Sequence, residues 1–432
     1  MSVLSLPADH PLRAELSEEV HARPPHPLSP PMQASYIVLQ TPPDRREANW
    51  AAVADLAASF GVGAPDVSAN YFTADLGEVR VIWECHSEFT RYTFIRPDPD
   101  LAEALDDPPV GRMPRKWLVS LPGEVLFAAH VLMIQDEKTA SQTDELTAKM
   151  FGDGELVGAS IAAGGAVAMT DFRTYKDGFN RFLIRNRSMT ERQAGRHVRA
   201  LLEMDTYRMM ALLGLPVARE LGRLLTGREK ELAGITREMV ETGASDENAL
   251  LDRLTRLASD IERRHSEHYY RFSASAAYYG IVQARIGELR EERIEGLQTF
   301  AEFTERRLAP AMNTVQAVSQ RLESMSKHLS RATQLLSTRV ALTQEQQSRK
   351  LLEAMARRAK LQLRLQQTVE GLSVAAITYY VVGLINYAAK GSETLGSPMD
   401  SALLTAISIP VVALALTFGV RRIRRMLKRS EK

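Results

Sequence analysis

Two uncharged runs near the carboxyl end constrain this chain most. Residues 371–389 read GLSVAAITYYVVGLINYAA, and residues 401–420 read SALLTAISIPVVALALTFGV. Each is close to the length of about 20 residues that a helix needs to cross a bilayer. A charge at mid-bilayer would cost about 3 kcal/mol, and neither run contains one. The alternative, a buried hairpin of a soluble protein, would call for amphipathic periodicity, which both runs lack. The sequence therefore predicts two transmembrane helices joined by an outer loop at residues 390–400.

Basic residues on both sides of this hairpin predict its orientation. Six precede the first run and six follow the second: Arg349, Lys350, Arg357, Arg358, Lys360, Arg364, Arg421, Arg422, Arg424, Arg425, Lys428 and Arg429. The loop holds only Lys390 against Glu393 and Asp400. Because positive residues stay inside, we expect both termini and the basic tail at residues 421–432 to be cytoplasmic. The amino terminus has no basic segment followed by an apolar one, so we expect no cleaved signal.

Composition restricts the function further. The net charge is +1 over 432 residues, so no overall field favours a nucleic-acid partner. Cys85 is the only cysteine, which excludes a disulfide framework and a CxxC site and fits a reducing compartment. Neither GxxxxGK[ST] nor GxGxxG is present. We expect no cofactor and no catalytic residue, so the protein is not expected to be an enzyme.

Residues 1–33 form a proline-rich arm. Closely spaced prolines disfavour helix and favour extended chain. His21 and His26 raise the alternative of a metal site, but five-residue spacing without a third ligand is typical of a packed arm. We therefore expect an ordered arm and no metal there.

Residues 34–187 have the pattern of a sheet domain. SYIVLQ reads as a buried strand, and a helix is predicted over residues 47–60. NYFTADL, EVRVIWECHS and FTRYTFI follow at short intervals, as consecutive antiparallel strands do. Further strands are expected at residues 124–135, 156–161, 166–172 and 180–186. Cys85 and His86 are neighbours in one strand and would point to opposite faces, which argues against a nucleophile and base pair.

Long helices follow. Residues 188–310 are helical by period, in segments at 189–213, 217–241 and 246–293. Residues 311–370 contain neither glycine nor proline and predict one long helix that continues into the first span. Leu322, Leu329 and Leu336 repeat every seven residues, which predicts a coiled-coil seam between copies of the chain. The predicted fold class is thus an α+β cytoplasmic domain, mostly an antiparallel sheet with flanking helices, followed by long helices and a transmembrane hairpin.

Patterns along nearly the whole chain resemble a known family. EVHARPP, YRMMALLGLP, RFSASAAYYGIVQARI and LQQTVEGLSVAAITYYVVGL are similar to an uncharacterised family of bacterial membrane-anchored proteins, a domain of unknown function with two carboxy-terminal spans. The resemblance implies the inner membrane of a bacterium and no particular activity.

The architecture also resembles the CorA class of magnesium channels, in which a long helix runs into the first of two spans. That class carries Gly-Met-Asn at the outer end of the first span. Here Gly383 and Asn386 are separated by two residues and followed by Tyr387. The resemblance implies a homo-oligomer that conducts a divalent cation, with these three residues at the outer pore mouth.

Two functions remain open from the sequence. The first is an oligomeric, CorA-like cation conduit, for which Ser373, Thr378, Asn386 and Tyr387 could supply polar groups. The second is a non-conducting anchor or scaffold in the lipid bilayer that presents a cytoplasmic interaction domain. In that case the same polar side chains would bond to backbone or to the neighbouring helix.

Overall fold

The computed structural model describes residues 8–13, 16–17, 24–101, 103–136, 140–241, 247–394 and 400–430. It divides into two compact units. The first consists of Met1–Glu241 and Ala249–Thr333, and the second consists of Thr242–Asn248 and Gln334–Lys432. His21 of the arm lies outside the described residues.

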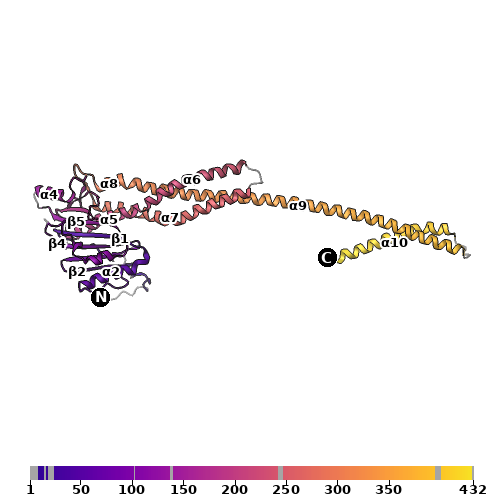
Figure 1. The fold of residues 1–432 in the computed structure, drawn as a ribbon, viewed down its shortest axis with the longest axis horizontal. Helices are drawn as coiled ribbons and strands as arrows, with labels where there is room; N and C mark the ends of the chain where they lie inside the picture. Colours follow the sequence, from indigo (N-terminus) through magenta and orange to yellow (C-terminus); the bar gives the residue numbers. More distant parts are fainter. Residues whose placement is uncertain are drawn as a thin grey trace. The chain divides into compact units, whose positions relative to one another are not determined.

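A mixed sheet lies at one end of the first unit, and the long helices lead away from it (Figure 1). Within the described residues it has nine strands in the order β2-β3-β4-β1-β5-β8-β7-β6-β9. The strands are β1 (Met32–Gln40), β2 (Tyr71–Leu76), β3 (Val79–Cys85), β4 (Phe89–Pro97), β5 (Glu124–Gln135), β6 (Val157–Ile161), β7 (Ala166–Thr170), β8 (Asn180–Asn186) and β9 (Glu292–Arg293). The eight expected strands are confirmed, and β9 is an addition.

Strand pairing in this sheet is antiparallel except between β5 and β8. Tight hairpins give the antiparallel order β2-β3-β4. The parallel pair arises because α4 (Ala140–Phe151) and the β6–β7 hairpin separate β5 from β8. A parallel pair needs such a long crossover. Helix α4 was not predicted from the sequence.

Helices cover both faces of the sheet. Residues alternate between faces along each strand, so Trp83, Tyr92 and Phe94 share one face. They form an apolar core with α2 (Arg46–Ser59) and α3 (Arg115–Ser120), beside the short 3-10 helices η1 (Pro43–Arg45) and η2 (Pro109–Arg112). The opposite face is covered by α5 (Glu191–Leu212), which begins with a capping box at Thr190.

Long helices complete the first unit. They are α6 (Gly214–Glu241), α7 (Glu247–Leu289), α8 (Phe300–Arg307) and the start of α9 (Ala309–Thr394). Pro216 is tolerated because it lies in the first turn of α6. Ion pairs tie α6 to α7 through Arg228 and Asp260 and α6 to α9 through Glu229 and Arg321. In Figure 1, α6, α7 and the first part of α9 lie alongside one another.

The second unit contains the predicted spans. Helix α9 continues unbroken to Thr394, which confirms the expected single helix through residues 311–389. Helix α10 runs from Ser401 to Ser430, so the helix extends into the basic tail. By length and composition, two helices of the described chain could cross a membrane: one within Phe300–Ser392 and one at Ser401–Arg422.

Candidate functional site

A network of charged side chains is buried between the sheet and α5. It lies on the face of β3 and β4 opposite the apolar core, because Glu84 and Arg91 alternate with Trp83 and Tyr92. Glu84 and Arg91 are also direct partners in the β3–β4 register. Register therefore places opposite charges side by side, and Arg91 Nε donates to Glu84 Oε2.

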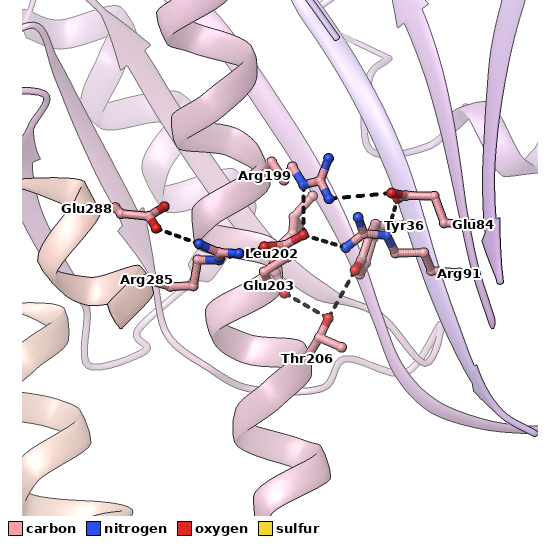
Figure 2. A network of polar contacts seen from close by, with 9 residues as sticks. All are labelled: Tyr36, Glu84, Arg91, Arg199, Leu202, Glu203, Thr206, Arg285 and Glu288. Carbon is pink, nitrogen blue, oxygen red and sulfur yellow. Dashed lines mark hydrogen bonds and ion pairs between the residues drawn. The ribbon is translucent and has the colours of Figure 1, made fainter. Parts of the chain in front are cut away.

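Glu203 of α5 is the centre of this network. Figure 2 shows its carboxylate among three guanidinium groups. Glu203 Oε1 accepts from Arg91 Nη1 at 2.8 Å and from Arg199 Nε at 2.7 Å, and Glu203 Oε2 accepts from Arg285 Nε at 2.6 Å. The Glu203 and Arg91 side chains are only 3% and 2% exposed. Such buried charges persist only when they are well paired.

The network links three parts of the first unit. Arg91 and Glu84 come from the sheet, Glu203 and Arg199 from α5, and Arg285 from α7. Arg199 Nη2 also donates to Glu84 Oε1 at 3.4 Å. Arg285 Nη1 reaches Glu288 Oε1 at 2.5 Å, one turn further along α7. Among the residues that the structure describes, these three arginines pair with three glutamates (Glu84, Glu203 and Glu288), so the arrangement can hold the elements together.

Burial and charge shift the pKa values of this network. Burial alone would raise the pKa of Glu203, but Arg91, Arg199 and Arg285 outweigh it and lower that pKa to about 2. The pKa of Arg91 is raised well above its ordinary value, since Tyr36, Glu84 and Glu203 overcome the opposing effect of burial. Glu203 and Arg91 therefore stay charged at neutral pH.

Tyr36 borders the network from β1. Burial raises its pKa to about 12. Thr206 Oγ1 donates to the Leu202 carbonyl at 2.8 Å, so the Tyr36 hydroxyl, 3.1 Å from Thr206 Oγ1, is the donor in that contact. Tyr36 is a neutral donor that fixes β1 to α5.

The described part of the proline-rich arm packs on α5 beside the network. Leu28 is buried, and its amide donates to the Glu191 carbonyl at 3.0 Å. A Cβ at Gly195 would lie 1.9 Å from the His26 carbonyl oxygen, so only glycine permits this approach. A cavity of about 60 Å³ remains between arm, sheet and α5, lined by Tyr71 and Arg91 among others.

This network was not predicted from the sequence. Two signals could have found it: Glu84 and Arg91 lie within β-rich segments, and Glu203 directly follows Leu201 and Leu202 and precedes Met204. A charge in a buried strand or helix face implies a partner. Which partner it is depends on how α5 and α7 pack on the sheet, and periodicity does not contain that information.

The residues proposed for an outer pore mouth lie in the second unit. Asn386 Oδ1 accepts a hydrogen bond from Thr405 Oγ1 at 3.3 Å, so the amide contacts α10 of its own chain. Tyr387 is 78% exposed. Gly383 has open space where a Cβ would be. Their role in a pore stays a prediction.

The leucines of the proposed seam are buried within the single chain. The exposed fractions of Leu322, Leu329 and Leu336 are 1%, 0% and 0%. Nearby on the same helix, Val315 and Val318 approach Gly214 and Gly222 of α6, which shows that this stretch of α9 packs against its own chain. Self-association through the seam stays a prediction.

The remaining candidates from the sequence lie apart. Cys85 belongs to the apolar core and donates to the His86 carbonyl at 3.8 Å, while His86 stacks on Phe89. His26 is described in the arm, where it contacts Arg80. Among the residues that the structure describes, no group of three metal-ligating side chains occurs.

Comparison with known families decides the identity. The family model described as "Protein of unknown function (DUF3422)" matches residues 8–427. The chain belongs to this family. The match covers the sheet, the long helices and both apolar segments of the DUF3422 chain, which confirms the resemblance to a domain of unknown function. No curated protein and no solved structure matches the chain, so the similarity to CorA channels stays a prediction.

Proposed function

We propose that this DUF3422 protein is anchored by the α9–α10 hairpin in the cytoplasmic membrane of a bacterium, with both termini in the cytoplasm. One observation carries the proposal: almost none of either apolar segment is buried inside the chain. Tyr380, Leu384 and Leu414 are 72%, 69% and 71% exposed. A soluble hairpin would bury such side chains, whereas lipid solvates them.

Polar groups of the two segments support the same proposal. Ser373 Oγ donates to the Val369 carbonyl at 2.9 Å and Thr378 Oγ1 to the Val374 carbonyl at 2.7 Å. A hydroxyl in hydrocarbon needs such a partner in its own helix. Pro410 within α10 is also acceptable in a span.

The same contacts favour an anchor over a conduit. A conduit needs polar groups that face a central path between several copies. Ser373, Thr378 and Asn386 each have a partner within the chain, so none of them requires a pore. The function we propose is therefore a non-conducting, non-catalytic anchor that presents the sheet domain to cytoplasmic partners.

Membrane flotation after alkaline carbonate extraction tests the anchor. The wild-type chain is expected to float with lipid. The double variant Tyr380→Asp and Val411→Asp places a charge near the middle of each segment, at a cost of about 3 kcal/mol each, and is expected to be extracted. The matched control, Ser348→Asp, changes an exposed residue of α9 outside the run and should float. Extraction of the wild-type chain would contradict the proposal.

Ion flux separates the anchor from the conduit. Liposomes that carry the purified protein are expected to take up magnesium, cobalt, nickel or zinc no faster than empty liposomes. Uptake by the parent that falls steeply in Asn386→Leu, with unchanged insertion, would establish the conduit instead.

A further inference from the structure

A cavity of about 300 Å³ lies where α5 meets the end of α7 and the β6–β7 turn. Its lining includes Arg196 and His197 of α5, Glu288 and Arg290 at the end of α7, and Ala162 of the turn. All these elements belong to the first unit. The volume is at the small end of the range of pockets that hold metabolites.

The charges around this cavity are unbalanced. Arg196 and Arg290 are exposed and, among the described residues, neither guanidinium has an ion pair or a side-chain hydrogen bond. Glu288 is the lining carboxylate, and Arg285 already holds it at 2.5 Å. Two guanidinium groups therefore face the cavity with no carboxylate to neutralise them. Arg199, one turn further along α5, by contrast pairs with Glu84 and Glu203.

The backbone at the rim is held in an unusual conformation. Ala162, Ala163 and Arg290 have φ angles of 57°, 53° and 48°, in the left-handed region that residues other than glycine avoid. Each such residue costs about 1 to 2 kcal/mol. The Ala162 amide donates to the Leu289 carbonyl at 2.9 Å, which joins the two strained segments. Strain of this kind concentrates at ligand sites, where it fixes the positions of binding groups.

His197 adds an oriented acceptor. Its Nδ1 lies 2.9 Å from the Gln193 carbonyl oxygen, which can only accept, so Nδ1 carries the proton. Nε2 is then the ring nitrogen that can accept from a ligand hydroxyl. The cavity thus offers two forked cations and one acceptor, which matches a phosphate group with a nearby hydroxyl.

We propose that this cavity binds a phosphomonoester, with Arg196 and Arg290 on the phosphate and His197 on a hydroxyl. The group can come from a soluble metabolite or from a lipid headgroup. The bound anion would lie beside Glu288, whose partner Arg285 leads directly to Glu203 (Figure 2). A ligand in this cavity would therefore be linked to the buried network through two ion pairs, Glu288–Arg285 and Arg285–Glu203.

Calorimetric titration of the full-length protein in detergent with glycerol 3-phosphate tests the site. We expect saturable binding. Charge-assisted hydrogen bonds contribute about 1.5 to 3 kcal/mol, so Arg196→Gln and Arg290→Gln should each weaken binding by about ten- to hundredfold. Arg192→Gln removes an exposed arginine one turn earlier on α5 that does not line the cavity, and should leave the affinity within about twofold.

Two further measurements identify the source of the phosphate group and check that the variants are folded. Liposomes with phosphatidic acid are compared with phosphatidylcholine liposomes. Binding of phosphatidic acid that Arg196→Gln weakens assigns the site to a lipid headgroup, and binding of glycerol 3-phosphate alone assigns it to a metabolite. Tryptophan fluorescence must show the variants folded. The proposal is overturned if neither probe binds, or if Arg192→Gln weakens binding as much as Arg196→Gln does.

Discussion

Glu203→Gln tests the buried network most severely. The substitution keeps the shape of the side chain but removes the charge that Arg91, Arg199 and Arg285 share. The Glu203 pKa of about 2, against an ordinary 4.5, corresponds to about 3 kcal/mol of stability for a side chain that is almost fully buried. Loss of one partner from a buried ion pair costs a similar 3 to 5 kcal/mol or so. We expect the free energy of unfolding at pH 7 to fall by about 3 kcal/mol.

Tryptophan fluorescence during urea unfolding of the full-length protein in detergent measures this change. The chain has three tryptophans: Trp50 lies in α2, Trp83 in β3 and Trp117 in α3. The fluorescence signal therefore reports unfolding of the sheet domain. Because the folded pKa of Glu203 lies below its unfolded value, its contribution is present above pH 4.5 and is lost as pH falls toward 2. The variant should lack this acid-dependent loss.

Asp75→Asn is the matched control for Glu203→Gln. Asp75 pairs with Arg80 in the same sheet, but the two side chains are 65% and 41% exposed. Exposed pairs contribute about 1 kcal/mol or less. If Glu203→Gln changed stability no more than Asp75→Asn does, the network would not stabilise the fold and the reasoning would be refuted.

Three further predictions concern the first unit. Gly195→Ala should displace the arm and lower the urea midpoint by the equivalent of about 1 to 3 kcal/mol, because its Cβ would overlap the His26 carbonyl; an unchanged midpoint would show that the arm does not pack there. Burial lowers the pKa of His130 to about 4, so stability should fall as pH drops from 6.5 toward 4, where only the unfolded chain takes up the proton; His130→Leu should flatten that part of the profile. Leu329→Ala should cost about 2 to 5 kcal/mol in thermal unfolding followed by circular dichroism, since the side chain is fully buried in its own chain; a smaller oligomer with unaltered stability would show instead that the seam joins copies.

Local pattern predicted most elements of this fold. Strands β5 and β8 have the expected bounds because each has an apolar centre, VLFAAHVLMI in β5 and FLI in β8, that is flanked by polar residues. Strand β9 consists only of Glu292 and Arg293 and has no such pattern. It follows shortly after the end of α7 and pairs with β6. Helix α7 accordingly ends at Leu289 rather than at Arg293.

The candidate sites could not be predicted in the same way. Arg91, Glu203 and Arg285 are distant in sequence, and their contact depends on how α5 and α7 pack on the sheet. The cavity beside Arg196 and Arg290 likewise depends on the left-handed turn at Ala162. Glycine or asparagine usually occupies such a turn position, so an alanine there does not predict the turn. Periodicity identifies elements, whereas these sites arise between elements.

Thiol labelling of the loop between the two proposed spans tests the membrane anchor most directly. In a Cys85→Ala background, Ser392→Cys places a thiol near the end of α9, and Ser348→Cys places one in the exposed part of α9 before the first apolar segment. A membrane-impermeant maleimide added to intact spheroplasts is expected to label Ser392→Cys and to spare Ser348→Cys until the cells are lysed. Labelling of Ser348→Cys in intact spheroplasts, or protection of Ser392→Cys, would contradict a hairpin with both ends in the cytoplasm.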